Sequence, residues 1–110
     1  MKSRSDLLQG TLDLLILKAL TLSPLHGWGV SKRIREMSRD VLEVNQGSLY
    51  PALHRLEDKG MITSEWKISD QGRRAKFYRL TRRGRNQYAG ERGRWEVFST
   101  AVRHTLQATS

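Results

Sequence analysis

The sequence contains no cysteine, only two prolines and few aromatic residues. Without cysteine there are no disulfides, thiolate metal sites or cysteine nucleophiles, which fits the reducing cytoplasm where we expect the protein to reside. Long hydrophobic runs are missing too. The most apolar stretch, residues 12–22, is interrupted by Asp13 and Lys18 and is too short and too charged to span a bilayer. We therefore expect a cytoplasmic protein with no membrane partner.

Motifs that would indicate catalysis are also absent. His26, His54 and His104 lie far apart and have no Asp or Glu at metal-ligand spacing. Ser48 has no base near it in sequence, and the chain has no glycine-rich phosphate-binding loop. The sequence thus predicts a protein that is not an enzyme and that needs neither a metal nor another cofactor.

Acidic residues are scarce relative to basic ones, with 11 Asp and Glu against 20 Lys and Arg, and the net charge is +9. The excess is localised. Residues 67–94 contain ten basic and two acidic residues (10 − 2 = +8), whereas the rest of the chain carries only +1. Such a basic segment attracts polyanions, so nucleic acid is the leading partner and anionic membrane the alternative.

The 110 residues suffice for one compact domain, and hydrophobic periodicity predicts helices in its first half. Residues 11–22 are almost continuously apolar and predict a central buried helix. In residues 27–37, Val30, Ile34 and Met37 fall on one face, which is typical of a short amphipathic helix.

A third helix has clear ends. Asn45 is a suitable N-cap, leucines recur at i, i+4 and i+7 from Leu49, and Gly60 follows a cationic last turn. Pro51 fits poorly, because only the first turn tolerates a missing N–H. The helix therefore either begins near Ser48 or has a distorted opening turn.

Beyond residue 60 the period changes to two. Residues 62–68 and 75–80 alternate as strands do, and turn-forming residues 69–73 join them, so we predict an antiparallel hairpin with basic residues at its tip. Trp66 shares a strand face with Ile62 and is interpreted as packing on the core. Thr81 is the predicted N-cap of a further helix.

The final segment carries a narrow apolar stripe, which is typical of a helix that packs on another helix. Its members are Tyr88, Trp95, Phe98, Val102 and Leu106. Gly84, Gly90 and Gly93 weaken the first half, where we expect bending or fraying. We predict a DNA-binding domain at residues 1–81 and a dimerisation helix at residues 82–110, with Trp95, Phe98, Val102 and Leu106 at the dimer interface.

Three helices followed by a hairpin is the element order of a winged helix-turn-helix, so the predicted fold is mainly α with a two-stranded β wing and a C-terminal dimerisation helix. The sequence also resembles the PadR family of transcriptional regulators. The resemblance runs closely from about residue 8 to residue 81 and rests on GTLDLLIL at 10–17, HGW at 26–28, GSLYPALHRL at 47–56, GMI at 60–62, Trp66 and RRAKFYRLT at 73–81. Trp28 departs from it, because the family usually has Tyr there. The resemblance implies a homodimer that binds double-stranded DNA and represses transcription.

The third helix is predicted to enter the major groove, since its leucines point to the core and its other face is left for DNA. The residues expected to contact DNA there are Gln46, Gly47, Ser48, Tyr50 and His54. For Tyr50 we prefer DNA contact over the alternative, packing on the second helix. In the wing, we expect Arg73, Arg74 and Lys76 to contact phosphates or an adjacent minor groove. Lys32 is either a backbone contact or a solvated residue.

We interpret the chain as a sequence-specific repressor that binds a palindromic operator as a homodimer. The alternative is a basic RNA-binding or ribosome-associated winged-helix protein. For Trp95 we prefer a dimer anchor without a ligand. Some relatives suggest instead that it lines a cavity between subunits for a small aromatic effector.

Overall fold

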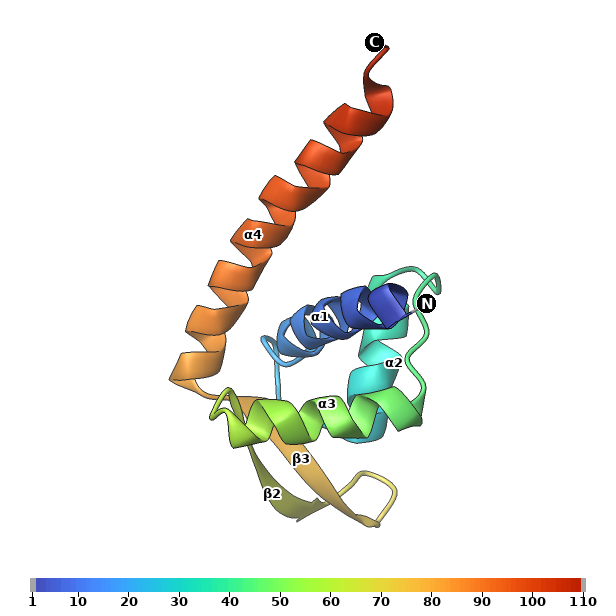
Figure 1. Cartoon of the computed structure of the whole chain (residues 1–110). Coiled ribbons are helices and arrows are strands. Elements are labelled where there is room, and N and C mark those ends of the chain that lie inside the picture. The colour runs from blue at the N-terminus through green and yellow to red at the C-terminus, as the bar shows by residue number, and fades with distance from the viewer. Residues whose placement is uncertain (1, 110) are drawn as a thin grey trace.

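The protein is mainly helical, with a small antiparallel sheet, in a computed structural model that describes the backbone of residues 2–109 and the side chains of residues 10–109 (Figure 1). The elements, in chain order, are α1 (Lys2–Ala19), β1 (Leu25–His26), α2 (Gly27–Met37), α3 (Gln46–Asp58), β2 (Ile62–Ile68), β3 (Arg74–Leu80) and α4 (Arg82–Gln107). The predicted mainly α winged-helix fold with a β2–β3 hairpin is confirmed, but the sheet has three strands in the order β1-β3-β2 rather than two. The additional strand, β1, pairs antiparallel with β3.

Side-chain caps fix where three of the helices begin. His26 Nδ1 accepts from the Gly29 amide at 3.0 Å before α2, and Asn45 Oδ1 accepts from Ser48 at 2.9 Å before α3. Thr81 Oγ1 accepts from the Gly84 amide at 3.0 Å before α4. The predicted caps of α3 and α4 are therefore confirmed.

Helix α3 begins at Gln46, so the predicted alternative of a start near Ser48 is wrong. Pro51 consequently lies in the second turn, where its missing N–H leaves the carbonyl of Gly47 without its usual donor. Helix α1 also differs from the expected bounds: it begins at Lys2 and ends at Ala19, and Leu22 beyond it is exposed.

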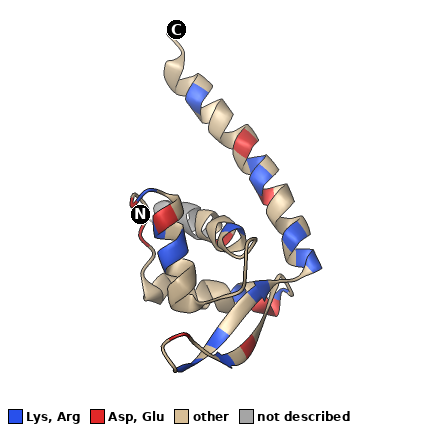
Figure 2. Cartoon of the chain, turned by 180° about the vertical axis from the view of Figure 1, so that it is seen from behind, with Lys and Arg blue, Asp and Glu red and all other residues tan. Residues whose placement is uncertain are grey.

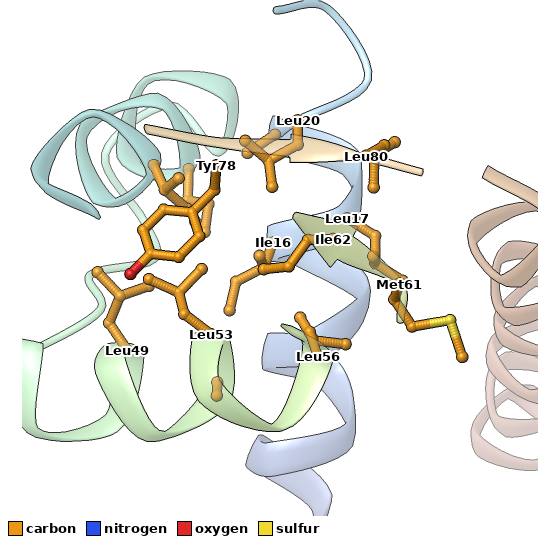
Figure 3. Packing of buried hydrophobic residues seen from close by; sticks show 14 residues of the cluster. Ile16, Leu17, Leu20, Leu49, Leu53, Leu56, Met61, Ile62, Tyr78 and Leu80 are labelled. Carbon is orange, nitrogen blue, oxygen red and sulfur yellow. The ribbon is translucent and has the colours of Figure 1, made fainter. Parts of the chain in front are cut away.

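The core lies where α1 meets α2, α3 and the sheet (Figure 3). Ile16, Leu17 and Leu20 of α1 are buried, as the continuous apolar run predicts. The other fully or nearly buried side chains are Ala19, Val30, Ile34, Leu49, Ala52, Leu53, Leu56, Met61, Ile62, Tyr78 and Leu80. Figure 3 shows the ring of Tyr78 descending from the sheet toward Leu49 and Leu53 of α3. The sheet therefore closes one side of the helical core.

Helix α4 leaves this core at a tight junction with Met61. The Met61 carbonyl oxygen accepts from the Thr81 amide at 3.1 Å and from Thr81 Oγ1 at 3.0 Å. A Cβ on Gly84 would lie 1.9 Å from the same oxygen, so a side chain does not fit there. Gly84 is a packing requirement rather than a weak point. The expected fraying is wrong, because α4 runs unbroken from Arg82 to Gln107 and Figure 1 shows no sharp bend.

Replacing Gly84 with Ala should destabilise the fold, because the new methyl group collides with a backbone carbonyl that cannot rotate away. We expect the free energy of unfolding to fall by about 2 kcal/mol or more, as for other overpacked sites. Gly93→Ala is the matched control. Beyond its chain neighbours and the adjacent helix backbone, a Cβ there meets nothing within 4 Å, so Gly93→Ala should be neutral or stabilising by up to about 1 kcal/mol. Urea denaturation of both variants measures the difference, and equal effects would contradict the junction described here.

Candidate nucleic-acid interface

The exposed face of α3 lies opposite its buried leucines. Leu49 and Leu53 are buried against the core, whereas Tyr50 and His54 are exposed on the other side of the helix. Gln46, Gly47 and Ser48 are exposed at its N-terminal end. All five residues predicted on this helix are thus exposed to a partner, and three of them lie at the N-terminal end that a groove-binding helix presents.

Tyr50 both packs and remains accessible. Its side chain is 41% exposed. A Cβ on Gly27 would lie 2.6 Å from the Tyr50 hydroxyl oxygen, which means that the ring rests directly on the first turn of α2. The predicted alternatives, contact and packing, are therefore compatible, since one side of the ring covers Gly27 while part of it stays open to a partner.

An ion pair ties α3 to α1. Arg55 Nη2 donates to Asp13 Oδ1 at 2.8 Å, and both side chains are partly buried. Burial raises the pKa of the Asp13 carboxyl, and the nearby Arg55 guanidinium opposes that rise. Because one partner comes from each helix, the pair restrains the orientation of α3 in the domain. Sequence reasoning missed it, as the two residues are 42 positions apart.

The wing, defined here as the β2–β3 hairpin, is joined to α3 through Glu57. Ser64 Oγ donates to Glu57 Oε2 at 2.6 Å, and Lys76 Nζ lies 3.7 Å from Glu57 Oε1. The predicted phosphate contact Lys76 therefore has a carboxylate beside it, which reduces its attraction for a phosphate. Arg73 and Arg74 are exposed near the tip.

Trp66 is not the core residue that the alternation of β2 predicts. It is 57% exposed, and Ile68 on the same face is 68% exposed. Only Ile62, at the start of the strand, reaches the core, because the hairpin extends beyond the helices that it packs on. The Arg74 guanidinium carbon lies 4.9 Å from the centroid of the Trp66 ring. The interpretation of Trp66 as core packing is therefore wrong.

Basic residues are spread over the wing and the first half of α4 (Figure 2). Lys32 lies elsewhere, on α2, with Nζ 5.2 Å from the centroid of the Trp28 ring. Trp28 is itself about half exposed. The structure thus places the predicted basic residues on α2 and the wing, on either side of α3 in the chain.

The apolar stripe of α4 divides into a covered and an uncovered part. Tyr88 packs against the core of its own domain, whereas Trp95 is 44% exposed. The exposed remainder of the stripe consists of Phe98, Val102 and Leu106. The Trp95 and Phe98 rings lie next to each other, with centroids 6.1 Å apart. Four of the five stripe residues therefore lack full cover from the described part of the chain.

Among the described residues, no group of three or more His, Asp or Glu side chains is placed to hold a metal ion. None of the helices in that same part has the length and apolar character needed to traverse a lipid bilayer.

A family model, a curated relative and solved structures all relate this chain to transcriptional regulators. The model of the transcriptional regulator PadR-like family matches residues 16–90. The transcriptional regulator Rv3488 of Mycobacterium tuberculosis is 40% identical over 68 residues, which are 62% of this chain and 63% of that protein. A PadR-like transcriptional regulator from Bacillus cereus has a similar structure, with a TM-score of 0.80, 28% identity, and coverage of 94% of this chain and 99% of that one. A regulator from Clostridium thermocellum also gives 0.80 and 28%, covering 90% and 96%.

Proposed function

The chain belongs to the PadR-like family of transcriptional regulators and is thus a DNA-binding regulator rather than an enzyme, and we propose that it represses transcription by binding a palindromic operator as a homodimer. In this proposal residues 1–81 bind DNA and residues 82–110 form the dimerisation helix. Helix α3 enters the major groove of each half-site, and the wing lies on the flanking duplex.

The observation that supports this assignment best is the exposed face of α3. Its N-terminal turn presents Gln46 and Ser48, whose side chains hydrogen-bond to base edges or phosphates, next to the exposed Gly47 backbone. Tyr50 and His54 continue the same face. Because the leucines on the other side are fixed in the core and Arg55 is paired with Asp13, this face is held rigidly outward.

The remaining proposed contacts lie beside each half-site. Arg73 on the wing and Lys32 on α2 neutralise phosphates and supply affinity more than sequence selection, whereas Arg74 reaches the phosphates or an adjacent minor groove. Lys76 contributes less, because Glu57 lies 3.7 Å from its ammonium group. These cations lie on α2, which precedes α3 in the chain, and on the wing, which follows it.

Helix α4 carries the proposed dimer interface. The face that begins with Tyr88 in the core continues as the exposed Trp95, Phe98, Val102 and Leu106. A second copy of α4 is the simplest cover for this apolar face, and a twofold axis matches a palindromic operator. We assign Trp95 an anchoring role, and a small aromatic effector between the subunits is the alternative.

Sequence discrimination should depend on α3. Gln46→Ala combined with Tyr50→Phe removes polar groups from the exposed face while keeping the Tyr50 ring on Gly27. We expect the ratio of operator to random-duplex affinity to fall by about tenfold, since one good base contact contributes about 1–3 kcal/mol. Fluorescence anisotropy with both duplexes measures the ratio. Asp58→Ala, at the exposed end of the same helix, is the control and should leave the ratio unchanged. If the double variant keeps the full ratio, α3 is not the discriminating element.

Dimerisation should depend on one face of α4. Trp95→Ala removes the proposed anchor, and such truncations often cost about 2 kcal/mol or more, so the protein should sediment toward monomer and bind the operator more weakly. Val97 is the matched control, because it is 73% exposed and lies on the opposite side of the helix. Val97→Ala should remain dimeric. A Trp95→Ala protein that sediments as a dimer with full operator affinity would refute this interface and favour the effector role.

A further inference from the structure

Trp66 and Arg74 belong to one face of the wing. In the β2–β3 register Trp66 is opposite Lys76, and Ile68 is opposite Arg74, so these four side chains share a face. Ile62 and Tyr78 lie on the same face nearer the core and are buried. The Glu57 carboxylate of α3 also binds this face, through Ser64 and Lys76. The exposed outer part of the face thus lies on the side of the sheet that α3 occupies.

Arg74 is held by an aromatic ring and not by an acid. Its guanidinium carbon is 4.9 Å from the Trp66 centroid, within the range of a cation–π interaction. Lys67 lies near Glu65 and Lys76 lies near Glu57, but Arg74 has no carboxylate partner among the described residues. No nearby acid among the described residues therefore offsets the charge of Arg74, and the indole limits its rotamers, which lowers the entropy that the side chain loses on binding.

We propose that Arg74, positioned by Trp66, enters the DNA minor groove and selects narrow, A·T-rich segments beside each half-site. The proposal rests on the proposed placement of α3 in the major groove. A minor groove about 6 Å wide admits a planar guanidinium but leaves an indole at its edge. Narrow A-tract grooves have an enhanced negative potential that attracts arginine. In this position Trp66 and Ile68 pack on the sugar edges that form the groove walls.

Charge favours DNA over a protein as the occupant of this surface. The apolar patch of Trp66 and Ile68 lies among Arg73, Arg74 and Lys76. Glu65 belongs to the opposite face of β2, and Asp70 lies in the turn that joins the strands. A second copy of this basic wing would bring like charges to Arg74, whereas a duplex supplies acceptors at the groove floor and phosphates along both walls.

The experiment compares the affinity of the full chain for two duplexes of equal length, one containing A-tracts and one built of G·C pairs, at one salt concentration. The wild type should prefer the A-tract duplex by about fivefold or more, the lower end of what one specific groove contact contributes. Trp66→Ala and Arg74→Lys should both lose this preference, whereas Trp66→Phe, which keeps an aromatic face, should retain part of it. Because Trp66 is mostly exposed, its variants should keep the melting temperature of the wild type.

Arg79→Ala is the matched control, because Arg79 is an exposed cation of the same strand on the opposite face. It should weaken binding to both duplexes equally. Equal wild-type affinity for the two duplexes, or a Trp66→Ala protein that retains the preference, would overturn the inference. A Trp66→Ala protein that sediments differently from the wild type would also overturn the inference, because the patch would then be a contact between chains. A failure of the proposed operator binding can be distinguished from these outcomes, because it would leave the ratio of operator to random-duplex affinity unchanged in the α3 variants.

Discussion

The arrangement depends on how three leucines seat α3 in the core. Leu49, Leu53 and Leu56 are almost completely buried between α1 and the sheet, so rotation of α3 about its axis would expose apolar surface. This constraint directs Gln46, Tyr50 and His54 outward. The Asp13–Arg55 pair then restrains the same helix from the α1 side. The orientation of the face that we propose to bind DNA is therefore set by packing and not by its own polar residues.

The second constraint is the junction at the Met61 carbonyl. Thr81 binds this oxygen and caps α4, while Gly84 allows the helix to pass directly over it. The junction fixes the direction of α4 relative to the wing, because Met61 immediately precedes β2 and Thr81 immediately follows β3. In a dimer formed through α4, this geometry would set the spacing between the two copies of α3 and hence between half-sites.

Features with local causes could be predicted from the sequence. The bounds of α2 and α3 follow from short-range periodicity, and the caps of Asn45 and Thr81 depend on amides three residues away. The exposed residues of α3 follow from the same periodicity. The family resemblance at residues 47–56 and 73–81 added the functional class.

Features with distant causes could not be predicted. Strand β1 has only two residues and exists because His26 and Leu25 pair with Phe77 and Tyr78. The alternation in β2 indicates which side chains share a face of the strand, but it does not indicate where the core beneath that face ends. The exposure of Trp66 therefore could not be predicted from it. From the sequence, Gly84 is only a glycine that weakens a helix. Its packing role depends on Met61, which lies beside it only in the folded chain. The central claim is that this chain recognises a symmetric duplex sequence, and selection from a pool of random duplex DNA tests it most directly. We predict enrichment of two inverted half-sites with centres about 10 base pairs, or one helical turn, apart. Recovery of no preferred duplex, or equal binding to structured RNA of unrelated sequence, would contradict it.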